Sequence, residues 1–252
     1  SVSAGLSPAI SPVTTPELST ALLGRYAGPC PRYTSYPTAD RFAAMTAGEG
    51  STAKSVAKPW DALKDVETLS LYVHIPFCRS LCYFCACNKV ITRQYGLASS
   101  YLDRVLEEAR WYRERVAGVP VTQLHLGGGT PTYLNDSDLT RLVHGLQEVF
   151  NLQPGDDAEY SIEADPRVLE VETLDTLRGL GFNRLSMGIQ DFNPDVQRAI
   201  NRICSPQQVR ALTHAARERG FRSISYDLIY GLPGQDVASL ERTIDTVIDL
   251  AP

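Results

Sequence analysis

Residues 69–90 read LSLYVHIPFCRSLCYFCACNKV and decide the expected fold, because they join a strand to a chemically distinctive loop. The first seven residues, LSLYVHI, are a short apolar run that is typical of a strand. The loop after them places Cys78, Cys82 and Cys85 in the spacing C-x3-C-x2-C. This position indicates that the chemistry lies at the carboxyl end of the first strand.

Strand-like and helical segments alternate from this loop to the end of the chain. Strands are expected over 121–126, 159–164, 183–190 and 221–231, and helices over 97–116, 136–150, 171–181, 194–201, 206–219 and 236–250. Asp136 or Ser137 is expected to cap the second helix, and Gly181 and Gly220 to end two others. Alternation of this kind predicts β-α-β units, and therefore an α/β fold with a parallel sheet.

The polar and glycine-rich residues cluster where these strands end. The cysteine loop, Gly127-Gly128-Gly129, Glu163, Gln190 and Asp227 all lie at or near the ends of different strands. Because ligands of parallel sheets bind at the carboxyl ends of the strands, we expect these groups to form one site.

The chain is expected to divide into three parts. Residues 1–25 are rich in Ser, Pro, Thr and Ala and are predicted to form a flexible tail. Residues 26–68 are predicted to be an arm and linker, and residues 69–252 the core domain. Another strand should follow the helix over 236–250, so we expect the core to be incomplete.

Composition favours an ordinary globular protein, with 43% hydrophobic residues and a net charge of −5. This mild charge gives no reason to expect nucleic acid or an acidic membrane surface as a partner. No apolar run approaches the roughly 20 residues that span a bilayer, and the N-terminus does not resemble a secretory signal. A cytoplasmic location and a monomeric state are the default expectations.

Four of the six cysteines fall within residues 78–87, which indicates a metal or cluster site and not a disulfide framework. Three thiolates can hold a [4Fe–4S] cluster and leave one iron without a protein ligand, unlike a four-cysteine ferredoxin site. That open iron can bind the amino and carboxylate groups of S-adenosylmethionine (SAM). A structural zinc site, with Cys87 or His74 as fourth ligand, stays open as an alternative.

The C-x3-C-x2-C motif is the signature of the radical SAM superfamily, and the longer pattern resembles the oxygen-independent coproporphyrinogen III oxidase family. The resemblance also rests on PRYTSYPTA (31–39), LGGGTPTYL (126–134), SIEADPR (161–167), GFNRLSMGIQDFN (181–193) and DLIYGLPGQ (227–235). Haem chaperones and a haem-degrading methyltransferase lineage share the core motifs. They usually lack the 31–39 arm and the Cys87-Asn88-Lys89 ending, so both features favour the oxidase family.

The resemblance implies a partial (β/α)6 radical SAM barrel, truncated before its last strands, and a C-terminal domain that this chain lacks. It also implies a reaction. A reduced [4Fe–4S] cluster cleaves SAM, and the resulting 5′-deoxyadenosyl radical removes hydrogen from a propionate of coproporphyrinogen III. Loss of CO2 and one electron leaves a vinyl group, and two such events give protoporphyrinogen IX. An unidentified electron donor is required, and the 31–39 arm is expected to close over the barrel mouth.

The same resemblance assigns the site residues. It makes Cys78, Cys82 and Cys85 the cluster ligands, and it assigns SAM binding to Tyr72, Phe84, Gly128, Gly129, Thr130, Glu163, Gln190, Arg202 and Asp227. The last three are expected to contact a second SAM.

Several of these residues have plainer readings. Tyr72 can be a core tyrosine, and Phe84 can simply pack over the loop. Gly128 and Gly129 can form a tight turn, and Arg202 can be a solvated helix residue. Cys87 is expected to be a small buried residue near the cluster, and Cys30 and Cys204 ordinary buried thiols.

Overall fold

The computed structural model describes residues 20, 66–116, 118–153, 155 and 157–252. The sheet lies in the unit that spans residues 56–252. Cys30, the 31–39 motif and most of the expected tail and arm lie outside the described residues. Within the described part, no helix has both the length and the apolar character needed to cross a bilayer.

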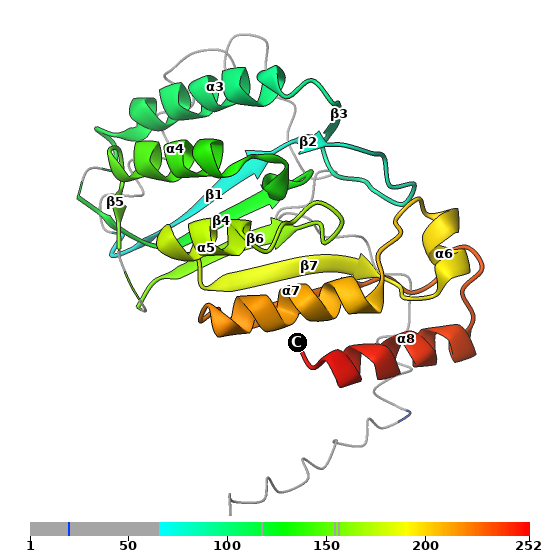
Figure 1. The fold of residues 1–252 in the computed structure, drawn as a ribbon. Helices are drawn as coiled ribbons and strands as arrows, with labels where there is room; N and C mark the ends of the chain where they lie inside the picture. Colours follow the sequence, from blue (N-terminus) through cyan, green and yellow to red (C-terminus); the bar gives the residue numbers. More distant parts are fainter. Residues whose placement is uncertain (1–19, 21–65, 117, 154, 156) are drawn as a thin grey trace, which may run out of the picture. The chain divides into compact units, whose positions relative to one another are not determined.

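A parallel sheet runs through the unit of residues 56–252 (Figure 1). Its main path is β1 (Leu69–Ile75), β4 (Pro120–Gly128), β6 (Glu159–Ala164), β7 (Arg184–Gln190) and β8 (Ser223–Leu228), paired in that order. Each of these pairs is parallel, and the short β5 (Asn151–Leu152) pairs with β4. Strands that follow one another in the sequence are therefore neighbours in space, which confirms the α/β expectation.

Helices follow the strands, and all but the short helix Pro194–Ala199 contribute to the apolar core on one face of the sheet. They are α3 (Gly96–Tyr112), α4 (Asp136–Gln147), α5 (Thr173–Gly179), α6 (Pro194–Ala199), α7 (Pro206–Glu218) and α8 (Val237–Leu250). The expected cap of α4 was wrong by one residue. Asn135 has an extended backbone, and its side chain accepts the N–H of Asp138 at 2.8 Å, which places it at the N-cap.

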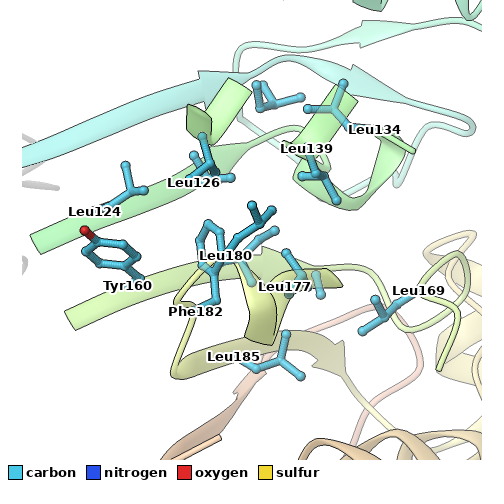
Figure 2. Packing of buried hydrophobic residues seen from close by; sticks show 14 of the residues in the cluster. Leu124, Leu126, Leu134, Leu139, Tyr160, Leu169, Leu177, Leu180, Phe182 and Leu185 are labelled. Carbon is cyan, nitrogen blue, oxygen red and sulfur yellow. The ribbon is translucent and has the colours of Figure 1, made fainter. Parts of the chain in front are cut away.

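The core lies between the sheet and these helices, where apolar strand residues that mostly alternate along the chain are buried or half-buried (Figure 2). Leu124 and Leu126 of β4 and Leu185 of β7 face Leu177 of α5 and the neighbouring Phe182, all at 1% exposure or less. Side chains alternate between the two faces of a strand, so the residues between them point away from the helices. They form a polar face whose members are Ser70, Tyr72, His74, Gln123, His125, Ser161, Glu163, Ser186 and Asp227.

The expected strand over 221–231 is too long at both ends. β8 begins at Ser223 and stops at Leu228. Beyond it the chain turns, with Tyr230 at 85% exposure and Gly231 at a φ of +78°, a conformation that continues no strand.

Candidate functional site

Two short parallel strands that the sequence did not predict close the cysteine loop. They are β2 (Phe77–Cys78) and β3 (Val90–Ile91). The Val90 N–H donates to the Pro76 carbonyl at 2.8 Å, and the Thr92 N–H donates to the Cys78 carbonyl at 3.0 Å. The two ends of the loop are thus joined by backbone hydrogen bonds, which confine the cysteines between them.

The Cys87-Asn88-Lys89 ending supplies further closure from inside the loop. The Lys89 ammonium donates to the backbone carbonyls of Cys85 at 2.9 Å and Cys87 at 3.3 Å. The Asn88 carbonyl lies 2.9 Å from His74 Nε2, on β1. Lys89 therefore holds the loop in a compact shape, and His74 ties it to the sheet.

A cavity of about 360 Å³ opens at the carboxyl ends of the strands, beside this loop. Its lining includes Cys78, Cys82, Cys85, Phe84, Gly128, Gly129, Thr130, Glu163, Gln190, Arg202 and Asp227. These are all the predicted cluster and SAM residues except Tyr72. The fold thus brings together groups from the cysteine loop, four strand ends and the α6–α7 loop.

The three predicted cluster thiols lie close enough for two of them to affect the third electrostatically. Burial raises the pKa of Cys78, and the nearby thiols of Cys85 and Cys82 raise it further, although a hydrogen bond with Thr130 opposes the shift. Among the described residues, no three His, Cys, Asp or Glu side chains gather around a point that suits a single metal ion. Cys78, Cys82 and Cys85 come from one loop and line one cavity, and three such thiols are a donor set that suits an Fe–S cluster.

The glycines after β4 allow close approach of the backbone to the loop. Gly128 has a φ of +118°, and a Cβ there would lie 2.8 Å from the His74 ring. A Cβ on Gly129 would lie 2.5 Å from the Pro76 carbonyl oxygen and 3.0 Å from Cys78 Sγ. The turn is tight, as the plain reading supposed, and it brings the backbone against Cys78, one of the three predicted cluster ligands.

Tyr72 lies on the polar face beside the cavity and not in the core. Its side chain is 56% exposed, its hydroxyl is 3.0 Å from His74 Nδ1, and its ring stacks on His125 at 5.7 Å between centroids. His125 Nε2 lies 3.3 Å from Glu163 Oε1, and the other Glu163 oxygen accepts the Gly128 N–H at 3.1 Å. The core-tyrosine reading is therefore wrong, and Tyr72 is linked through His125 to a cavity residue.

Two predicted SAM residues, Gln190 and Asp227, line the cavity at the ends of β7 and β8. Gln190 ends β7 with a φ of +72°, which is rare for a residue other than glycine, and its side chain is buried. Asp227 accepts the Ser186 hydroxyl at 3.1 Å, and burial raises the pKa of its carboxyl group. Phe84 lines the cavity and also packs against an apolar cluster that includes Val196, so its SAM contact stays a prediction beside an observed packing role.

Arg202 is not a solvated helix residue, because it lies in the loop between α6 and α7 and is 8% exposed. Asn201, with a φ of +55°, turns the chain after α6 and directs Arg202 inward. The Arg202 guanidinium donates twice to the Gly188 carbonyl, at 2.8 and 2.6 Å. A buried cation with a fixed carbonyl partner is suited to binding anionic groups.

Two cysteines outside the predicted ligand set differ in their surroundings. Cys87 lines the cavity and is exposed, so the expectation of a buried residue was wrong. Cys204 is 3% exposed, and burial raises the pKa of its thiol to about 11, as expected for an unreactive buried cysteine.

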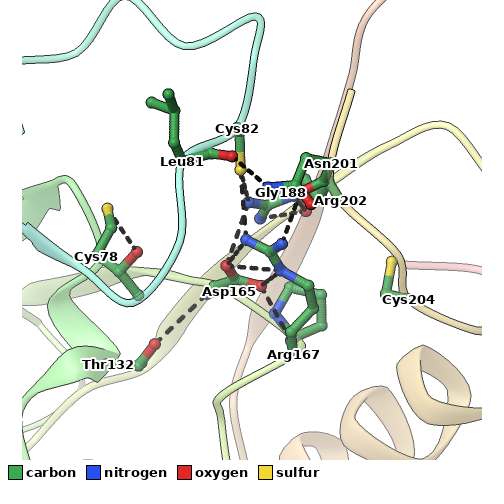
Figure 3. A network of polar contacts seen from close by, with 12 residues as sticks. Cys78, Leu81, Cys82, Thr132, Asp165, Arg167, Gly188, Asn201, Arg202 and Cys204 are labelled. Atoms are coloured by element: carbon green, nitrogen blue, oxygen red, sulfur yellow. Dashed lines mark hydrogen bonds and ion pairs between the residues drawn. The ribbon is translucent and has the colours of Figure 1, made fainter. Parts of the chain in front are cut away.

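Sequence reasoning missed Asp165 and Arg167, which line the same cavity (Figure 3). The Arg167 side chain donates to both carboxylate oxygens of Asp165, at distances from 2.6 to 3.1 Å. Burial opposes ionisation of Asp165, but Arg167 and Arg202 outweigh it and hold the pKa of the carboxyl group below its usual value. A signal was present, since both residues follow Glu163 within the quoted SIEADPR segment.

Comparison with known proteins agrees with this geometry. The model of the radical SAM superfamily matches residues 72–247. Oxygen-independent coproporphyrinogen III oxidase from Escherichia coli is 50% identical over 232 residues, which are 92% of this chain and 49% of the relative. The enzyme of the same name from Pseudomonas aeruginosa is 47% identical over 232 residues, which cover 92% of this chain and 50% of the relative.

A solved structure resembles the described fold closely. It is coproporphyrinogen III oxidase (HemN) from Escherichia coli, with a TM-score of 0.82 and 47% identity over 92% of this chain and 50% of that chain. The chain thus spans about half the length of the relatives it matches. The superfamily match extends from Tyr72 through the cysteine loop and every strand end at the cavity. The chain belongs to the radical SAM superfamily, whose cofactors are a [4Fe–4S] cluster and SAM.

Proposed function

We propose that this chain forms the radical SAM part of an oxygen-independent coproporphyrinogen III oxidase, which converts two propionates of its substrate to vinyl groups. One observation carries the proposal: a single cavity unites the three motif cysteines with all but one of the predicted SAM residues. The names and high identity of the relatives support the choice of substrate. Coproporphyrinogen III, an electron donor, a monomeric state and a cytoplasmic location are parts of this proposal.

The cysteines would hold the cluster, and the other cavity residues would hold SAM. When bound, the two cofactors supply a radical that can remove hydrogen from an unactivated carbon. The Gly128-Gly129 backbone would meet the amino and carboxylate groups of SAM. The Glu163 carboxylate, which accepts the Gly128 N–H, would accept from the ribose or amino group of SAM. Phe84 offers an apolar surface for a nucleobase. The protein thus binds, orients and shields, while the cofactors break the bonds.

Gln190, Arg202 and Asp227 lie on the β7 and β8 side of the same cavity, where we place the second SAM or a substrate carboxylate. Arg202 supplies the positive charge, and the carboxyl of Asp227 is held by Ser186. The polar face with Tyr72 continues this surface along the sheet and is available for the remainder of a large ligand.

Low-temperature EPR on anaerobically reconstituted, reduced protein tests the cofactor site. We expect iron and sulfide in the ratio of a [4Fe–4S] cluster and a [4Fe–4S]+ signal that changes when SAM is added. Replacing Cys78, Cys82 and Cys85 together with alanine should abolish the signal. The matched control, Cys204→Ala, removes a buried thiol outside the cavity and should retain it. A zinc-loaded protein without sulfide would contradict the proposal.

Turnover is tested by supplying the cluster-loaded protein with SAM, a reductant and coproporphyrinogen III. The oxidase proposal predicts protoporphyrinogen IX and the release of two CO2 per substrate molecule. A haem chaperone would bind haem stoichiometrically and leave coproporphyrinogen III unchanged, and a haem methyltransferase would alter haem. Either result, with the cluster intact, would reject the substrate and keep the radical SAM assignment.

A further inference from the structure

A hydrogen-bonded network of three charged residues lies against one of the three motif cysteines (Figure 3). Asp165 is at its centre and follows the end of β6. Arg167 donates to both oxygens of the Asp165 carboxylate, and Arg202 reaches one of them at 3.3 Å. The side chains of Asp165 and Arg202 are 7% and 10% exposed, so these contacts are only weakly screened by water.

Both guanidinium groups also donate to the sulfur of Cys82. The distances are 3.3 Å from Arg167 and 3.4 Å from Arg202. Two cations against one carboxylate leave a net positive charge beside this sulfur. Cys82, the Asp165 and Arg167 pair, and Arg202 come from three separate loops, so only the fold can create this arrangement.

The same network anchors the loop that carries Cys82. The remaining Arg167 nitrogen donates to the Asn201 carbonyl at 3.0 Å, and the Asn201 amide donates to the Leu81 carbonyl at 2.7 Å. The Tyr83 N–H donates to the Ile200 carbonyl at 3.1 Å. Leu81 and Tyr83, on either side of Cys82, are therefore fixed to the end of α6 and the loop after it. Arg167 joins Cys82 to the same loop through Asn201.

The surroundings of Cys82 differ from those of Cys78. The sulfur of Cys78 lies 3.3 Å from the neutral hydroxyl of Thr130, whereas the sulfur of Cys82 has two charged donors. Hydrogen bonds to cluster sulfurs and nearby charge set the reduction potential of an Fe–S cluster, because they stabilise the more negative, reduced state.

We propose that Asp165 and Arg167 are positioning residues that, with Arg202, hold the Cys82 thiolate and raise the reduction potential of the cluster. Asp165 orients both guanidinium groups toward the sulfur, and Arg167 supplies charge and a hydrogen bond without needing to touch SAM. This inference rests on the proposed cluster ligands and adds a control of the potential to them.

An EPR-monitored redox titration of the reconstituted chain, without SAM or substrate, tests the proposal. The variant Arg167→Met keeps an unbranched, flexible apolar stem and removes the charge and the donors. We expect its reduction equilibrium to be about tenfold less favourable, a shift of about 59 mV to lower potential for a one-electron couple. Arg167→Lys retains the charge but not the forked geometry and should shift the potential less.

The matched control is Arg210→Met, which breaks an exposed pair with Asp249 and should leave the potential unchanged. Wild-type potential in both Arg167 variants, with normal iron and sulfide, would overturn the network and leave the oxidase proposal intact. If Arg167→Met fails to assemble a cluster, the potential of Arg167→Lys decides. Absence of any cluster from the wild-type chain would overturn the ligand assignment and the network together.

Discussion

The two faces of the sheet differ in burial and in the kind of contacts that their side chains make. On the face toward the helices, Leu126, Ile162 and Leu185 are 0–1% exposed and contact one another through a continuous apolar core. On the other face, Tyr72 is 56% exposed and is joined to its neighbours by a hydrogen bond and ring stacking. Neighbouring residues along one strand thus serve stability and chemistry separately. Mutations should affect these two properties separately as well.

The largest effect on stability is expected in the core. Phe182→Ala removes a ring that is 0% exposed and packs edge-to-face on Tyr160. The free energy of unfolding should fall by about 3–5 kcal/mol, because lost transfer energy and a cavity add together. Urea denaturation measures it, and Tyr83→Ala, at a 69% exposed position, is the control. A loss below about 1 kcal/mol would show that the core at Phe182 collapses around the gap.

A smaller loss of stability is expected at the tight turn that ends β4. Gly128→Ala forces a Cβ onto a residue with a φ of +118° and against the His74 ring. We expect destabilisation by about 1–3 kcal/mol, measured by thermal and urea unfolding. Gly96→Ala is the matched control, since a Cβ there meets nothing within 4 Å at the start of α3. The control should be neutral or slightly stabilising, and equal losses in both variants would contradict this account.

A third prediction concerns a buried carboxylate next to the site. Asp191 follows Gln190, is 0% exposed, and accepts the Thr243 hydroxyl at 2.8 Å. Thr243→Val removes one of the two donors to that oxygen, which keeps the Asn193 N–H at 2.6 Å, and it takes away the acceptor of the buried Phe192 N–H. The variant should cost about 1–3 kcal/mol of unfolding free energy. Thr246→Val on the same helix removes a hydroxyl that donates only to the Arg242 carbonyl, and it should stay within about 0.5 kcal/mol.

The smallest effect on stability is expected on the polar face. Tyr72→Phe removes one exposed hydroxyl and should change the unfolding free energy by less than about 0.5 kcal/mol. If Tyr72 contacts SAM, as the family resemblance implies, SAM binding to the cluster-loaded protein should weaken by about 1 kcal/mol. Titration calorimetry measures the binding, with Tyr83→Phe as the control. Normal SAM affinity together with a loss of stability would assign Tyr72 a structural role instead.

Local patterns explain why so much of the fold was predictable. The strand over 159–164 and the helix over 206–219 each show the hydrophobic period of their own element, which can be recognised within a short stretch of sequence. The strand over 221–231 was too long because its apolar character continues through Ile229 and Tyr230 into a turn. Boundaries depend on where hydrogen bonds to a neighbouring strand stop, and the period of a single strand carries no information about that.

The sequence by itself determined the order of strands and helices, the parallel sheet, the cysteine triad, and the meeting of polar groups at the strand ends. Those features follow from spacing within short segments and from the way successive β-α-β units stack. Only the tertiary structure decided that Arg167 and Arg202 both reach Cys82, that Tyr72 stacks on His125, and that Cys87 is exposed. Arg167 and Arg202 lie 85 and 120 positions from Cys82 in the sequence. They meet it because of the course of the loops and the directions of the side chains, and the hydrophobic period of a single helix or strand contains no information about either.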